Sequence, residues 1–139
     1  MRNFFIVIFI ILLNGAAYAQ NGYVPAKVLG INDQNSLLVE RTDRPGTKIN
    51  IVIRGIQLAR QDGDCAAERQ LAAETRQTIM DLIGGENIIL LNPSPVPNRL
   101  YAEADVLTHD HIDIANYLTT RAIIAQPTDT GLRADWCRK

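Results

Sequence analysis

The chain has little of what a nucleic-acid-binding surface needs. Its 14 basic and 15 acidic side chains give a formal net charge of −1, and aromatic residues make up only 6% of the 139 residues. Proteins that hold the phosphate backbone by bulk electrostatics carry a basic surplus, and proteins that hold unpaired bases stack them on aromatic rings. Bulk nucleic-acid binding is therefore not expected.

Cysteine is also scarce, since the chain contains only Cys65 and Cys137. Two thiols so far apart in the sequence are too few ligands for a metal centre. In an oxidising compartment, an even number of cysteines predicts a disulfide. The chain-entropy model assigns about 4 kcal/mol of stability to a bridge that closes a loop of roughly 70 residues.

Long hydrophobic runs are absent except at the amino end, where residues 4–13 are all apolar. Arg2 precedes this run, and Ala17 and Ala19 place small residues where a signal peptidase cuts. A ten-residue helix rises about 15 Å, half of the ~30 Å hydrocarbon core of a bilayer. Residues 1–19 are therefore predicted to be a signal peptide, with an uncleaved amino-terminal anchor as the alternative. Residues 20–139 are predicted to be one exported domain, periplasmic or secreted, with no membrane span.

The first half of this domain reads as three strands followed by a helix. Apolar and β-branched stretches at 23–29, 36–41 and 49–56 are separated by polar and Pro-Gly turn segments, as in an antiparallel meander. Apolar residues then recur at helical spacing over 65–83, and Gly84-Gly85 provides an end signal. We expect Asp62 or Asp64 to cap this helix and Glu68 to lie on its solvent face.

The second half predicts two more strands and a further helix. Strands are expected over 87–91 and 100–108, joined by an exposed proline-rich connection at 92–98, and a helix over 112–120. Residues 121–139 are expected to form a tail held by Cys137. Five strands with a helix between the third and the fourth predict an α+β fold, a five-stranded OB-type β-barrel with two to three helices. A two-layer α+β sandwich is the alternative.

Five short motifs follow one another in an order typical of a known family. They are Ile31 to Val39, Ile51 to Arg60, Cys65-Ala66-Ala67-Glu68, Val96 to Ala102 and Trp136-Cys137. With these motifs the chain resembles the staphylococcal nuclease-like (thermonuclease) family over nearly all of its predicted mature region, as a degenerate member. The resemblance implies the OB-type barrel of that family and, for members with an intact site, a calcium-dependent nuclease.

The resemblance also implies that the metal site has lost its charge. It places two carboxylate ligands at Asn35 and Gln57 and a backbone carbonyl ligand at Leu58, a ligand that the change of side chain need not abolish. A hard cation prefers anionic oxygens, whereas both carboxylates are replaced by neutral amides. Calcium, the cofactor of the family, is therefore not expected here, and neither is any other cofactor.

The remaining catalytic positions are altered as well. The resemblance places the general base at Arg60, which cannot accept a proton at neutral pH, and the two phosphate-binding arginines at Val52 and Arg99, of which only Arg99 is retained. Loss of a general base costs about 10²–10⁴ in rate, and loss of a Lewis-acid metal removes several kcal/mol more. We therefore expect a catalytically inactive protein that serves as a binding or cell-envelope assembly module.

Three arginines are the candidate binding residues of such a module. Arg54, Arg60 and Arg99 are positioned in the motifs to attract a small anionic ligand or an acidic partner surface, such as that of another envelope protein. The alternative is a residual or altered phosphodiesterase, a nuclease acting on nucleic acid with Arg54 and Arg99.

Two further clusters have a functional and a plainer interpretation. His109 and His111 with Asp113 have the spacing of a transition-metal site if they lie in a strand, but a polar turn is the expected structure. Glu103 and Asp105 are two residues apart and lie on one face of a predicted strand, as the paired acids of an active site do. The expected structure is nevertheless a solvated face of the barrel.

Overall fold

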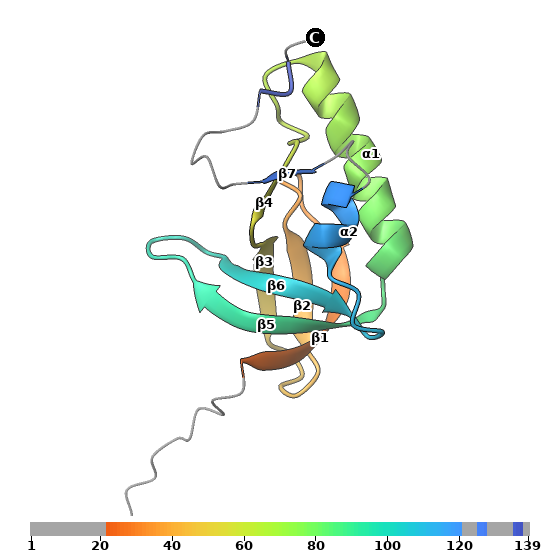
Figure 1. Cartoon of the computed structure of the whole chain (residues 1–139). Helices are drawn as coiled ribbons and strands as arrows, with labels where there is room; N and C mark the ends of the chain where they lie inside the picture. Colours follow the sequence, from red (N-terminus) through yellow and green to blue (C-terminus); the bar gives the residue numbers. More distant parts are fainter. Residues whose placement is uncertain (1–21, 121–124, 128–134, 138–139) are drawn as a thin grey trace, which may run out of the picture.

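The computed structural model describes residues 22–120, 125–127 and 135–137 (Figure 1). The predicted signal peptide over 1–19 and most of the predicted tail over 121–139 lie outside these ranges. Within them, no helix combines the length and the apolar character needed to cross a membrane.

Five strands form a closed barrel in the order β1–β2–β3–β6–β5. Neighbouring strands are antiparallel except for β3 and β6, which run parallel. Helix α1 connects β3 and the short β4 to β5, so the strand order and the helix position are those of an OB-type barrel. The predicted α+β class and five-stranded barrel are confirmed, and the sandwich alternative is wrong. The barrel strands are β1 (Tyr23–Ile31), β2 (Leu37–Arg41), β3 (Lys48–Ile53), β5 (Asn87–Pro95) and β6 (Ala102–Thr108).

The core fills the barrel and continues to the two helices, α1 (Ala66–Ile83) and α2 (Ile114–Thr120). Alternate residues of the strands point inward, as the burial of every second residue along β6 shows. Ile79 and Ile83 of α1 and Ile114 and Leu118 of α2 belong to the same core cluster. Both helices therefore pack against the barrel and share its core (Figure 1).

The third predicted strand is interrupted, contrary to expectation. Strand β3 ends at Ile53, and Gly55 adopts a left-handed φ of 82° that turns the chain. The short β4 (Ile56–Leu58) then leaves the barrel and pairs antiparallel with β7 (Ala125–Pro127), a strand that the sequence did not predict. Pairing with a distant segment stabilises β4, and no local pattern shows such a partner.

The proline-rich segment is partly strand, whereas an exposed connection over 92–98 was predicted. Strand β5 continues to Pro95, with a register shift between Leu91 and Ser94 opposite β6. Its pairing with β1 ends at Leu91. The N–H of Asn92 still donates to the Gly22 carbonyl next to β1, and beyond Asn92 the described residues pair β5 with β6 alone. Such an edge tolerates prolines, which have no N–H to donate.

The amino end of α1 is also built differently from the prediction. Cys65 is the cap, with Sγ accepting the N–H of Glu68 at 3.4 Å, so the prediction that Asp62 or Asp64 caps the helix is wrong. Glu68 is only 1% exposed and does not lie on the solvent face. The predicted disulfide is confirmed, because Cys65 is bonded to Cys137. It joins the end of the chain to the start of α1.

Candidate functional site

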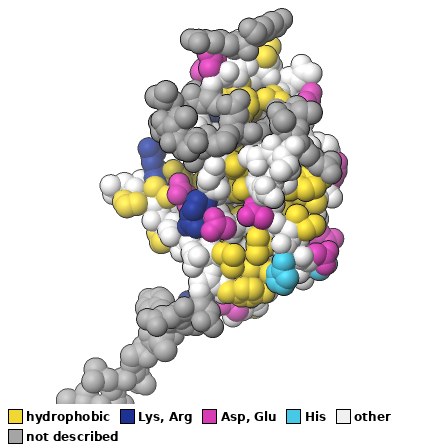
Figure 2. All heavy atoms as spheres, in the orientation of Figure 1, with side chains coloured by type: hydrophobic (Ala, Val, Ile, Leu, Met, Phe, Trp, Pro, Cys, Tyr) yellow, Lys and Arg dark blue, Asp and Glu magenta, His cyan; other side chains and the backbone are white. Residues whose placement is uncertain are grey.

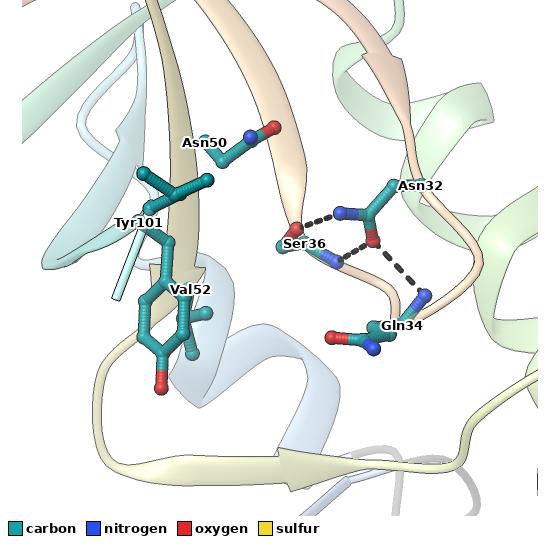
Figure 3. A pocket seen from close by; sticks show the side chains of 7 residues that line it. Asn32, Gln34, Ser36, Asn50, Val52 and Tyr101 are labelled. Atoms are coloured by element: carbon teal, nitrogen blue, oxygen red, sulfur yellow. Dashed lines mark hydrogen bonds between the residues drawn. The ribbon is translucent and has the colours of Figure 1, made fainter. Parts of the chain in front are cut away.

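A pocket of about 270 Å³ opens on the barrel wall between β3 and two loops, the β1–β2 loop over 32–36 and the β5–β6 loop over 96–101 (Figure 3). OB-type barrels bind oligonucleotides and oligosaccharides on this face, formed by their second and third strands and these two loops. We call it the barrel-face pocket. Its lining residues are Asn32, Gln34, Ser36, Asn50, Val52, Leu100 and Tyr101.

Asn32 organises one wall of the barrel-face pocket. Its Oδ1 accepts the backbone N–H groups of Gln34 and Ser36, each at 3.0 Å, and its Nδ2 donates to the Ser36 hydroxyl (Figure 3). An Asn side chain that bonds to the backbone just ahead of it fixes a tight turn. The Asn32 amide is thus used to hold the loop, and it leaves Gln34 and Ser36 facing the pocket.

Polar groups without partners face the same space. Over residues 22–120 and the two short segments, the amides of Gln34 and Asn50 and the hydroxyl of Tyr101 make no side-chain hydrogen bond. Figure 3 shows the Tyr101 ring lying alongside Val52, across the pocket from Gln34. The pocket therefore offers neutral donors and acceptors next to an aromatic ring and a valine.

The position that the resemblance assigns to the first metal ligand lies beside this pocket but faces inward. Asn35 is 3% exposed, and its Nδ2 donates to the Ala59 carbonyl, while its Oδ1 is buried without a partner in the described residues. The Asp33 carbonyl accepts the N–H of Gln61 at 3.0 Å, which holds the β1–β2 loop against the segment after β4. The fold thus brings together the two segments that the resemblance assigns to the metal site.

The donor set at this junction does not fit calcium. Asn35 contributes one neutral carbonyl oxygen, Gln57 lies on β4 opposite β7, and Leu58 packs against the core. Calcium is held by six to eight oxygens, several of them anionic. In the part of the chain that the structure describes, three or more His, Cys, Asp or Glu side chains nowhere gather in a metal-binding arrangement.

Arg54 ties three strands together. Its Nη1 lies 3.1 Å from Oδ2 of Asp105, and its Nη2 donates to the carbonyl oxygens of Asn92 at 2.7 Å and Glu103 at 3.0 Å. These contacts join the end of β3 to β5 and β6. The guanidinium is held by the barrel itself, and Asp105 has Arg54 as its partner.

Arg60 is neutralised by a close acid, and Arg99 is not. Asp62 accepts two hydrogen bonds from the Arg60 guanidinium, at 2.6 and 2.9 Å, and this pairing raises the pKa of Arg60 despite the opposing effect of burial. Arg99 is exposed in the β5–β6 loop, and among the described residues only its backbone N–H is bonded, donating to the Val96 carbonyl at 3.1 Å. On the face drawn in Figure 2, the described basic side chains form no continuous patch, and acidic side chains lie beside them.

The histidine cluster forms the polar turn that was expected. His109 and Asp110 lie in a turn after β6, with His109 Nε2 3.0 Å from Oδ1 of Asp110. His111 adopts a left-handed φ of 64°, and its N–H donates to the Thr108 carbonyl at 2.9 Å. The cluster therefore closes the connection between β6 and α2.

The structure brings together a different set of residues from the predicted one. Of the positions singled out by the resemblance, only Val52 lines the barrel-face pocket. Gln34, Asn50 and Tyr101 were missed, because isolated amides and a single tyrosine carry no sequence signature. The available signal was the predicted strand order, which places the first loop and the loop before the fifth strand on the ligand-binding face.

Comparison with protein-family models and with curated proteins finds no match for this chain.

Proposed function

We propose that the protein is an exported, disulfide-bonded binding module with a nuclease-like OB fold, that it does not cleave nucleic acid, and that its ligand occupies the barrel-face pocket. One observation carries this proposal. The pocket lies on the face where OB-type barrels bind ligands, and its lining is uncharged, with amides at Gln34 and Asn50 that have no hydrogen-bond partner among the described residues. Such a lining supports recognition rather than hydrolysis.

The charges around the pocket argue against phosphodiester cleavage. A nuclease must stabilise the developing negative charge with cations aimed at the phosphate. Arg54 is held by Asp105 and two carbonyls, and Arg60 by Asp62, so neither guanidinium is presented to a ligand as a free charge. Arg99 is exposed but does not line the pocket.

Export is supported by two independent features. The apolar run over 4–13 has the length and flanks of a signal peptide, and the Cys65–Cys137 bridge belongs to an oxidising compartment. A role in a cell-envelope assembly fits both features. Isolation of the native protein from an envelope extract in a stoichiometric complex is the expected result for such a role, and recovery of a free monomer alone contradicts it.

A digestion experiment tests the absence of cleavage. The purified, oxidised protein is incubated with millimolar calcium and single- or double-stranded DNA or RNA, with and without a chelator. We expect every substrate to remain intact, and Arg99→Ala to behave like the wild type. Cleavage that requires Arg99 and stops on chelation contradicts the proposal and supports the phosphodiesterase alternative.

A further inference from the structure

The geometry points to a neutral oligosaccharide as the ligand of the barrel-face pocket, an inference that rests on the proposed binding function. It is carried by three properties of the lining residues: their charge, their hydrogen-bonding groups and the apolar surface among them.

The lining carries no formal charge. All seven side chains are neutral: three amides, a serine, a tyrosine, a valine and a leucine. The nearest acid of the β1–β2 loop, Asp33, is paired with Arg76 at 3.7 Å and does not line the pocket. Single-stranded nucleic acid is held by a positively charged groove that follows the phosphates, and nothing in this lining supplies one. An uncharged ligand needs no such groove.

The hydrogen-bonding groups match hydroxyls. Each amide of Gln34 and Asn50 presents both a donor and an acceptor, and so does the Tyr101 hydroxyl. The Ser36 oxygen accepts from Asn32, which leaves its own proton available to donate. A sugar hydroxyl is likewise a donor and an acceptor at once, so a ring bearing several hydroxyls satisfies these groups without a net charge on either side.

Apolar surface lies among these polar groups. Tyr101 and Val52 lie side by side in the pocket (Figure 3). Leu100 also lines the pocket and is 96% exposed. The C–H face of a pyranose ring is apolar and packs flat on an aromatic ring. A ligand that covers Leu100 and Tyr101 removes this surface from water, which favours binding.

The size of the pocket suits a short stretch of such a chain. Its volume of about 270 Å³ lies just below the roughly 300–1,000 Å³ of sites that enclose drug-sized ligands. One or two sugar rings fill it, and the rest of an oligosaccharide runs over the exposed β5–β6 loop. We therefore expect affinity to grow with the length of the oligosaccharide.

The test is a titration of the ¹⁵N-labelled, oxidised protein followed by NMR. The probes are maltohexaose, cellohexaose and chitohexaose, which are neutral, and a thymidine oligonucleotide, which is anionic. We expect at least one neutral probe to shift the side-chain amide signals of Gln34 and Asn50 and the backbone signal of Tyr101 in a saturable way. The oligonucleotide is expected to leave these signals in place.

Variants then separate the pocket from the rest of the surface. Gln34→Ala and Asn50→Ala are expected to weaken the binding of that probe at least tenfold, while Gln70→Ala, an exposed amide on α1, leaves it unchanged. The spectrum of each variant without a probe shows that it is folded.

Two results overturn the inference. One is the absence of shifts at these three residues with every neutral probe at millimolar concentration. The other is saturable binding of the oligonucleotide at the same residues, which leaves a binding function but changes the ligand class. Failure of the proposed function is separate, because it is detected as cleavage in the digestion experiment.

Discussion

Glu68 is a buried carboxylate that holds the segment preceding α1. Its oxygens accept the backbone N–H groups of Asp64 at 3.0 Å and Arg60 at 3.3 Å. Gly63 packs so closely that a Cβ there would come within 2.4 Å of the Glu68 Cδ. An acid predicted from helical periodicity to face solvent thus stabilises the turn that carries the chain from β4 into α1.

Glu68→Ala is expected to lower the free energy of unfolding by about 2–3 kcal/mol, because backbone donors lose a charged acceptor in a buried site. Urea unfolding measures the change. Glu74→Ala, an exposed acid on the same helix, serves as the control and is expected to cost less than about 0.5 kcal/mol. Equal effects of the two substitutions would show that the carboxylate does not organise the loop.

Asp43 shows how a surface ion pair affects titration. Two hydrogen bonds from the Arg41 guanidinium, at 2.9 and 2.6 Å, hold the pKa of the Asp43 carboxyl below its ordinary value. A lowered folded-state pKa adds stability above the unfolded-state pKa, and this stability is lost as the pH falls through the folded-state pKa. We expect an NMR titration to give the Asp43 carboxyl a pKa below the ordinary aspartate value, and we expect Arg41→Ala to raise this pKa towards the ordinary value. An unchanged midpoint in the variant contradicts this assignment.

At the scale of elements, Arg54 joins the parallel pair β3–β6 to β5. Arg54→Ala is expected to destabilise the protein by about 1–2 kcal/mol, less than a fully buried network would, because the side chain is 31% exposed. Arg99→Ala removes the same kind of side chain from the β5–β6 loop and is expected to change the urea midpoint very little. If Arg99→Ala is the more destabilising substitution, Arg54 does not have this structural role.

The Cys65–Cys137 bridge connects the cap of α1 to the end of the chain. Replacing both cysteines by serine keeps a good helix cap, because serine is a preferred N-cap residue. The expected loss is therefore that of the cross-link alone, up to about 4 kcal/mol. Thermal unfolding of this variant and of the reduced wild type is expected to give the same lowered midpoint. A variant as stable as the oxidised protein contradicts the prediction.

The elements differ in how far the sequence predicts them. Strands with alternating burial, such as β6, and the long helix α1 follow from local periodicity, and their predicted bounds agree within a few residues. Strand β4 was merged with β3 and strand β7 was missed, since both depend on pairing with each other across the chain. Prolines disfavour a strand, so the sequence predicts a connection over 92–98. In the barrel, the last part of β5 pairs with β6, and this distant pairing cannot be seen in the local sequence.

At the scale of the whole molecule, calcium is expected to have no effect on stability. An ion that binds only the folded state at one hundred times its Kd adds about 2.7 kcal/mol, enough to raise the Tm by several degrees. Asn35, Gln57 and Leu58 offer too few anionic oxygens for such binding. We therefore expect the same Tm with millimolar calcium, with magnesium and with a chelator. A rise specific to calcium would restore the metal-dependent interpretation.

The sequence alone determined the order of the five barrel strands and the two helices, the pairing of the two cysteines and the absence of acidic side chains at Asn35, Gln57 and Arg60. Each of these depends on residue type, local period or a count, and needs no knowledge of distant contacts. Only the tertiary structure decided which side chains share the barrel-face pocket and which arginines are paired with acidic side chains. Gln34, Asn50 and Tyr101 come from three separate segments, and Arg54 and Arg60 find their acids only in the folded chain. Closure of the barrel creates these neighbours, so the barrel-face pocket is a property of the fold.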